Sequence, residues 1–122
     1  MDKRAIGEAC LRAADRIMVP GQWAKYILAV DQFGHGAHVL SPQACSWCAI
    51  GAIMKELRVH ELPTSTMRII DAALEGMARD GTGVLIAEEN DFADSPEPAA
   101  ALLREIGRRL IAEADDETQP EN

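Results

Sequence analysis

The sequence lacks a hydrophobic run long enough to cross a membrane. A membrane-spanning helix needs ~20 consecutive, mostly apolar residues, and Lys, Arg, Asp or Glu interrupts every candidate stretch of this 122-residue chain. The first residues do not resemble a signal peptide either, because Glu8, Arg12 and Asp15 break up the apolar core that such a peptide requires. We therefore expect a soluble cytoplasmic protein that has no membrane partner.

Cysteine is scarce as well. Three cysteines, Cys10, Cys45 and Cys48, cannot form a complete set of intrachain disulfides. The chain also lies within the ~100–150 residues typical of one domain, so its core is large enough to fold without covalent cross-links. A reducing compartment such as the cytoplasm fits this composition.

Lysine and arginine are fewer than aspartate and glutamate, and the difference lies in the second half of the chain. The formal net charge is −8. Residues 1–61 contain seven Lys or Arg and six Asp or Glu, whereas residues 62–122 contain five and fourteen. An acidic surface repels phosphates and attracts cations, so we expect no direct nucleic-acid binding and instead a basic surface of a larger protein as partner. The simpler alternative is that the charge only maintains solubility.

Apolar residues recur at helical spacing in four segments. The pattern predicts helices over residues 2–18, about 42–58, about 64–80 and about 96–114. Ser41-Pro42 and Ser95-Pro96 are typical helix starts, and Thr64 or Thr66 is a candidate cap for the third helix.

The segments between these helices are less decided. Residues 23–30 favour a helix only weakly, and residues 82–87 are compatible with an extended segment or a turn, followed by an acidic turn at residues 88–91.

The predicted fold is mainly α. We expect a compact bundle of four to five helices in one domain, residues 1–114, with one or two short extended segments and an acidic flexible tail, residues 115–122. The predicted helix 42–58 lies at the centre, because it carries two apolar faces. Its bulky face consists of Trp47, Ile50, Ile53 or Met54, and Leu57, and its small face of Ala44, Cys48, Gly51 and Ala52. Small residues let a second backbone come close, which offsets the ~1 kcal/mol that Gly51 costs inside a helix.

Two histidines and two cysteines form a candidate metal site. His35 and His38 precede Cys45-x-x-Cys48, and four such ligands can hold zinc tetrahedrally. The order of the ligands is not that of a zinc finger, and there is no second C-x-x-C, so buried cysteines and surface histidines are the simpler interpretation.

A redox role would place the C-x-x-C at the start of a helix, whereas Cys45 is expected about one turn inside. We therefore expect no metal and no cofactor, with a zinc-stabilised interaction module as an alternative.

A small thiol-dependent hydrolase is the other alternative. Cys45 or Cys48 would be the nucleophile and His38 or His60 the base, with Asn90 or Asp91 orienting that base. A nucleophile usually lies in the first turn of its helix, which favours Cys45 over Cys48. Packing in the core accounts for both cysteines more simply.

Two motifs in the sequence resemble a known family. The first is the run Trp47-Cys48-Ala49-Ile50-Gly51-Ala52, or W-C-x-x-G-A, and the second is Asn90-Asp91 ahead of the final helix; Trp23, the turn at 31–34 and Ala44 add support. Over roughly residues 5–112 the chain resembles a family of small uncharacterised bacterial and phage proteins, a domain of unknown function. The chain departs from that pattern at Glu88-Glu89, where an aromatic residue would be less surprising. The resemblance implies a compact, mostly helical fold and a phage or mobile-element origin, but no activity and no functional residue.

The acidic stretch between the last two predicted helices is the candidate binding site. It comprises Glu88, Glu89, Asp91, Asp94 and Glu97, which we expect to be exposed. The function that we favour is a non-enzymatic binding protein whose acidic surface imitates phosphates. With a phage origin, it would inhibit a host defence or nucleic-acid-handling complex, as an anti-CRISPR protein does.

Overall fold

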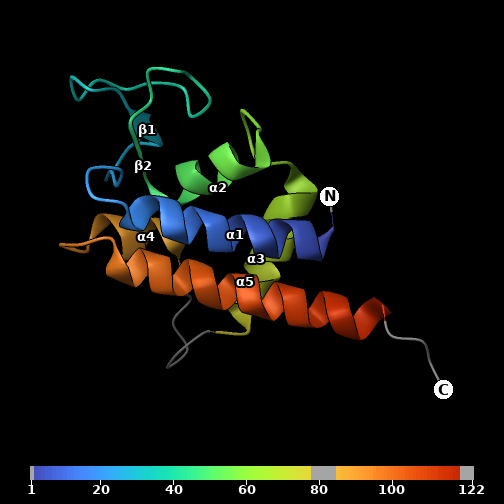
Figure 1. Ribbon diagram of the computed structural model, residues 1–122. Helices are drawn as coiled ribbons and strands as arrows, with labels where there is room; N and C mark the ends of the chain where they lie inside the picture. The colour runs from blue at the N-terminus through green and yellow to red at the C-terminus, as the bar shows by residue number, and fades with distance from the viewer. Residues whose placement is uncertain (1, 78–84, 119–122) are drawn as a thin grey trace.

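Five helices and one short two-stranded sheet form the part of the chain that the computed structural model describes, residues 2–77 and 85–118 (Figure 1). The helices are α1 (Lys3–Met18), α2 (Ala49–Leu57), α3 (Thr64–Glu75), α4 (Ile86–Asp91) and α5 (Glu97–Thr118), and the strands are β1 (Ala29–Val30) and β2 (Ser46–Trp47). The predicted mainly helical bundle is confirmed. No described helix combines the length and the apolar character needed to span a bilayer.

The most extensive helix contact joins α1 to α5, which run antiparallel through the middle of the bundle (Figure 1). Two glycines allow this close approach. A Cβ atom on Gly7 would lie 2.8 Å from the carbonyl oxygen of Gly107, and a Cβ atom on Gly107 would lie 2.8 Å from that of Gly7. Helix α1 begins where predicted, because the carboxylate of Asp2 accepts the N–H of Ala5 at 2.8 Å as an N-cap.

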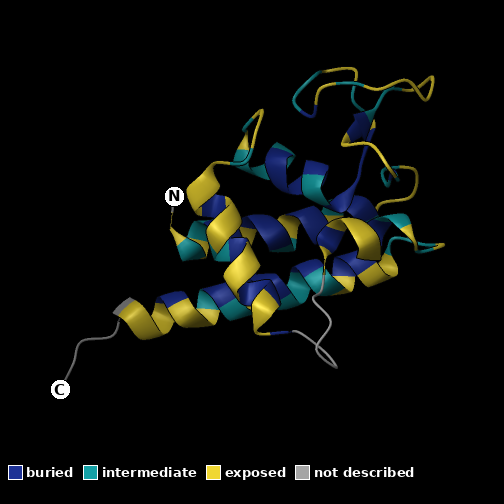
Figure 2. Cartoon of the chain, turned by 180° about the vertical axis from the view of Figure 1, so that it is seen from behind, coloured by how far each residue is buried: buried dark blue, intermediate teal, exposed yellow. Residues whose placement is uncertain are grey.

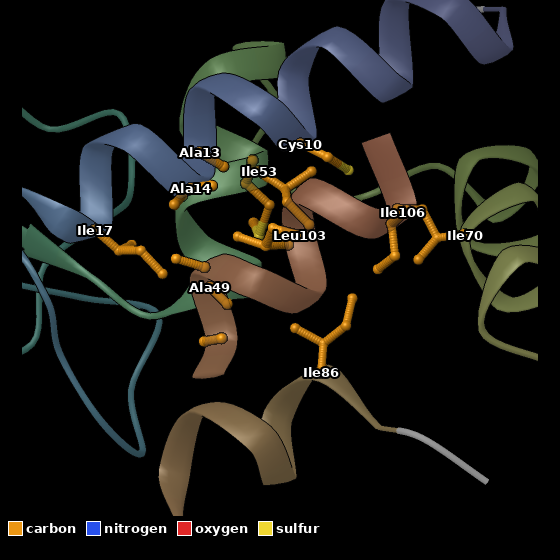
Figure 3. Close-up of a cluster of buried hydrophobic side chains, with 14 of the residues drawn as sticks. Cys10, Ala13, Ala14, Ile17, Ala49, Ile53, Ile70, Ile86, Leu103 and Ile106 are labelled. Carbon is orange, nitrogen blue, oxygen red and sulfur yellow. The ribbon is translucent and has the colours of Figure 1, made fainter. Parts of the chain in front are cut away.

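The core lies where α1, α2 and α5 meet, and side chains from α3 and α4 close it (Figure 3). Its largest fully buried apolar side chains are Ile6, Ile17, Ile53, Leu103, Ile106 and Leu110. Burial of each such side chain contributes ~1.5–3 kcal/mol of hydrophobic free energy, which is the main source of stability in a domain of this size. The buried faces of α1 and α5 point inward, while much of α3 and α4 faces solvent (Figure 2).

The predicted central helix over residues 42–58 is wrong in its first half, because α2 begins only at Ala49. The chain before it pairs with β1; for example, the N–H of Cys45 donates to the carbonyl oxygen of Val30 at 2.8 Å. A backbone donor that is bonded to another strand is not available to a helix. The Ser41-Pro42 start signal therefore begins a turn, in which the Ser41 hydroxyl accepts the N–H of Gln43 at 3.2 Å.

Cys48 is the N-cap residue of α2. Its sulfur accepts the N–H of Gly51 at 3.3 Å, and its own N–H donates to the carbonyl oxygen of Leu28 at 3.2 Å. A Cβ atom on Gly51 would lie only 1.9 Å from that same oxygen. The expected approach of a second backbone to the small face is thus confirmed, and the backbone that approaches belongs to the loop before β1.

Residues 23–30 do not form the weakly favoured helix. Ala29 and Val30 form β1, which pairs antiparallel with β2 in the register Ala29↔Trp47 and Val30↔Ser46. Trp23 forms a further isolated bridge with Trp47. An apolar run of this length is compatible with a strand or a helix. Hydrogen bonding to β2 stabilises the strand at Ala29 and Val30.

Helix α4 was not predicted. Residues 88–91, interpreted as an acidic turn, belong to this helix, which buries Ile86 and Asn90 one turn apart. Burial of these two side chains fixes a short helix that sequence pattern alone cannot support. Residues 82–84 of the segment that was left open lie outside the described residues.

Two helix ends differ from the predictions. The N-cap position of α3 is Pro63, without a side-chain cap, so neither Thr64 nor Thr66 caps it; the predicted end near residue 80 lies outside the described residues. Helix α5 continues to Thr118, so residues 115–118 are helical rather than part of a flexible tail. Residues 119–122 lie outside the described residues.

Candidate functional site

Helix α4 presents an amphipathic surface to solvent. Leu85, Glu88, Glu89 and Phe92 follow the spacing i, i+3, i+4, i+7, which places them on one side of a helix; we call this surface the α4 face. Leu85 and Phe92 occupy the two cap positions and are 53% and 77% exposed. Glu88 and Glu89 are exposed between them.

Four of the five predicted acidic site residues are exposed, and the fifth has a different environment. The carboxylates of Glu88, Glu89, Asp94 and Glu97 make no ion pair with any Lys, Arg or His that the structure describes. Asp91 is half-buried instead. The expectation that Asp91 belongs to the exposed acidic surface is therefore wrong, because this side chain takes part in internal hydrogen bonds described below.

Several acidic residues further along α5 differ from those of α4 because they are paired. Glu113 and Glu117 form ion pairs with Lys3 of α1, and Glu105 pairs with Arg109 at 3.1 Å. These partners balance the charge along α5. The carboxylates of α4 and the following turn, which pair with no described cation, are thus a separate acidic surface.

Asn90 connects segments that are far apart in the sequence. Its Oδ1 accepts the indole N–H of Trp23 at 2.8 Å and the backbone N–H of Ala49 at 3.0 Å. Its Nδ2 donates to the carbonyl oxygen of Ala24 and to Oδ1 of Asp91, both at 3.0 Å. The side chain is 1% exposed, so its full hydrogen-bonding capacity is used inside the protein.

A pocket of about 190 Å³ lies next to Asn90. Ile27, Leu28, Ile50 and Ala87 form apolar walls, and Cys48 and Asp91 contribute polar atoms.

Tyr26 is at the edge of this pocket in a left-handed backbone conformation, with φ at 68°. Its N–H donates to Oδ1 of Asp91 at 2.8 Å. A non-glycine residue rarely adopts this conformation, and the hydrogen bond to Asp91 adds to the bonds of Asn90 that hold the loop against α4.

The chain matches no family model, no curated protein and no solved structure. The proposals below therefore rest on geometry. Three residues from the segments on which the expected resemblance rests, Trp23, Ala49 and Asp91, all bond to Asn90. Packing and internal hydrogen bonding account for this grouping without any catalytic role.

The thiol-hydrolase residues are not assembled into a catalytic site. Burial raises the pKa of the Cys48 thiol, the N–H of Gly51 opposes that shift, and the negative charge of Asp91 adds to it. A nucleophilic cysteine needs a lowered pKa and a nearby base. No histidine is among the described residues that line the pocket; His38 and His60 are exposed and lie beside one another, with ring centroids 6.4 Å apart.

The candidate zinc ligands are also separate. Cys45 and Cys48 flank β2 instead of sharing one helix face, and the thiol of Cys45 donates to the carbonyl oxygen of Gln43 at 3.3 Å. His35 lies in an exposed turn beside Asp31. Across residues 2–77 and 85–118, no three His, Cys, Asp or Glu side chains come together in a group that could hold a metal ion.

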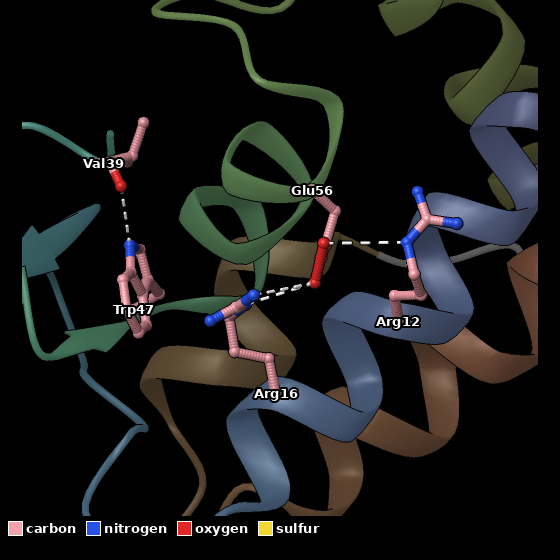
Figure 4. A network of polar contacts seen from close by, with 5 residues as sticks. All are labelled: Arg12, Arg16, Val39, Trp47 and Glu56. Carbon is pink, nitrogen blue, oxygen red and sulfur yellow. Dashed lines mark hydrogen bonds and ion pairs between the residues drawn. The ribbon is translucent and has the colours of Figure 1, made fainter. Parts of the chain in front are cut away.

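A basic cluster between α1 and α2 has a structural role. Arg16 donates to Glu56 from Nη2 at 3.0 Å and lies over the ring of Trp47, 5.0 Å from its centroid, while Nε of Arg12 lies 3.6 Å from Glu56 (Figure 4). The Trp47 indole N–H donates to the carbonyl oxygen of Val39 at 3.0 Å. Both arginines pair with Glu56, whose side chain is only 16% exposed, and these ion pairs connect α1 to α2.

Sequence reasoning missed the apolar part of the α4 face. The sequence does not single out Leu85 or Phe92, because residues 82–87 are compatible with an extended segment or a turn and only residues 88–91 are interpreted as an acidic turn. Had residues 86–91 been predicted as helix, the spacing of Leu85, Glu88, Glu89 and Phe92 would have indicated one mixed acidic and apolar surface.

Proposed function

We propose that the protein is a non-enzymatic binding protein that docks on a basic surface of a larger partner through the α4 face, with Asp94 and Glu97 beside it. The observation that supports this function is that Leu85 and Phe92, both largely exposed, flank two carboxylates without an ion-pair partner among the described residues. Exposed aromatic and apolar side chains within a polar rim are typical of protein interfaces.

The two kinds of side chain would have different tasks in this interface. Glu88 and Glu89 attract a basic surface and raise the rate of association, whereas Phe92 contributes the buried contact that slows dissociation. Proteins that bind nucleic acids do so through clusters of arginine and lysine that contact the phosphates. The carboxylates of the α4 face would imitate those phosphates and bind the same clusters. A nucleic-acid-handling or host defence complex is therefore the class of partner that we propose.

The test compares two charge reversals that change the net charge equally. Immobilised parent protein, Glu88→Lys/Glu89→Lys and Glu61→Lys/Asp116→Lys are each incubated with bacterial lysate, and captured proteins are identified by mass spectrometry. All four positions are exposed. Asp91 is left unchanged because its internal hydrogen bonds would confound the result.

We expect capture to be lost with the α4 variant and kept with the control, and to weaken as salt rises from about 50 to 300 mM. A Phe92→Ser variant should also lose the partner at low salt. Equal loss with both charge reversals would mean that only net charge matters, and equal retention would exclude the α4 face; either result contradicts the proposal.

A further inference from the structure

The pocket beside Asp91 has the shape and charge of a site for a small cation. We propose that it binds an alkylammonium group, which is a short apolar chain ending in a positively charged amine. This site is separate from the α4 face, so that either proposal can fail without the other.

The size and walls of the pocket fit a short hydrocarbon chain. Its volume of about 190 Å³ is below the ~300–1,000 Å³ of pockets that hold drug-sized ligands. Ile27, Leu28, Ile50 and Ala87 present apolar surface to an occupant. Methylene groups such as those of a lysine stem pack favourably on surface of this kind while their charged end reaches a polar partner.

The polar partner is Asp91, whose carboxylate is oriented by hydrogen bonds and makes no ion pair with a described residue. Both hydrogen bonds that it accepts from described residues, from Tyr26 N–H and Asn90 Nδ2, go to Oδ1. No described Lys, Arg or His forms an ion pair with it. No fully buried side-chain oxygen of the described residues lacks a hydrogen-bond partner, so Oδ2, which accepts no bond from a described residue, is not fully buried. A half-buried carboxylate without a cation in an apolar pocket favours a positively charged occupant.

The hydrogen bonding of Asp91 also selects among cations. A guanidinium group binds a carboxylate best through two parallel hydrogen bonds, one to each oxygen. Because Oδ1 is already occupied, Asp91 offers one oxygen, and a single oxygen suits the compact ammonium ion. Asn90 has no free hydrogen-bonding capacity, and the sulfur of Cys48 already accepts the N–H of Gly51. Oδ2 of Asp91 is therefore the acceptor that we expect to bind the ammonium end.

The experiment is a titration followed by amide resonances in two-dimensional NMR spectra. n-Butylamine hydrochloride should give saturable shifts centred on Tyr26, Ile27 and Ala87, with a dissociation constant in the ~millimolar range. n-Butanol, which has the same apolar chain without the charge, should bind at least about tenfold more weakly. Nα-acetyl-lysine N-methylamide is titrated in parallel: binding of both amines identifies a lysine side chain as a sufficient source, and binding of butylamine alone identifies a free small amine.

Two variants and a control make the test specific. Asp91→Asn keeps an oxygen at the position of Oδ1 and removes the charge, and Ala87→Leu fills the pocket while keeping the carboxylate; each should weaken butylamine binding at least about tenfold. Glu88→Gln removes a nearby charge that does not line the pocket and should bind as the parent does. The proposal is overturned if neither amine binds the parent, if butanol binds as well as butylamine, or if both pocket variants keep the parent's affinity.

Discussion

Asn90 joins the loop before β1, the first residue of α2 and the end of α4 through one side chain. Each of these bonds satisfies a polar group that the fold takes out of water, and an amide is needed because the site requires two acceptor positions and two donors together. Asp91 continues this network to Tyr26. At the scale of single residues, the pair Asn90-Asp91 is therefore part of the framework that shapes the pocket.

Replacing Asn90 by alanine should destabilise the protein by about 2–4 kcal/mol, because the Trp23 indole and the Ala49 N–H would lose their acceptor. Chemical denaturation followed by tryptophan fluorescence measures this free energy of unfolding. Glu89→Ala, one residue away on the exposed face, is the control and should change it by no more than about 0.5 kcal/mol. A loss for Asn90→Ala no larger than that of the control would show that these bonds do not stabilise the fold.

The pH dependence of stability should report the burial of Cys10. Burial raises the pKa of this thiol from 9.0 to about 12. Well below pH 9 the thiol is protonated in both states and its contribution to stability is complete. As pH rises through 9 towards 12, the unfolded chain loses the proton before the folded protein does, so stability falls by up to about 1.4 kcal/mol per pH unit.

Cys10→Ala removes this contribution, and its free energy of unfolding should therefore decline less steeply than that of the parent between pH 9 and 11. The raised pKa of Lys3, caused chiefly by its hydrogen bond to Glu117, affects both proteins alike, so the difference isolates Cys10. Equal slopes would show that the Cys10 thiolate is not disfavoured in the folded state.

At the scale of elements, long helices were easier to predict from the sequence than short ones. The long amphipathic helices α1 and α5 show their apolar stripe over many turns, and their cores were predicted. Helices α2 and α4 are short, and isolated helices of such length are marginal in water. Their boundaries depend on partners: the carbonyl oxygen of Leu28 at the start of α2, and the burial of Ile86 and Asn90 in α4.

Gly51→Ala should destabilise the protein by at least about 2 kcal/mol, although alanine favours helix formation by ~1 kcal/mol. The added Cβ would meet the Leu28 carbonyl oxygen at 1.9 Å, so the loop would have to move away from α2. Gly76→Ala is the matched control, since its nearest neighbour is the flexible end of Arg109 at 3.0 Å. Thermal and urea unfolding of both variants distinguish the effects, and equal stability of the two would contradict this close backbone contact.

At the scale of the whole molecule, the two longest helices are joined by ion pairs between their charged side chains. Ion pairs between α1 and α5, such as Lys3 with Glu117 and Arg104 with Asp15, balance the long helices against each other. The carboxylates of α4 and the following turn make no such pair with a described residue. The exposed carboxylates of α4 and the following turn therefore add negative charge at one end of the bundle, beside the exposed Phe92.

The fold should not depend on a metal ion. A single apolar core contains side chains from all five helices, and His35, His38, Cys45 and Cys48 are not gathered into one site. Incubation with excess EDTA should shift the melting temperature by less than about 1 °C. Stoichiometric zinc in protein purified without added metal, together with unfolding on chelation, would refute this prediction.

The sequence by itself determined the helical class, the extent of α1, the core of α5 and the acidic character of the second half, since periodicity and charge are local properties of the chain. Only the tertiary structure decided where α2 begins, that residues 86–91 form a helix, and that Asp91 belongs to an internal network. These outcomes depend on hydrogen bonds between residues such as Tyr26 and Asp91, or Trp23 and Asn90, which lie far apart in sequence. No local pattern encodes such pairings, because each donor gains its partner only after the helices have packed.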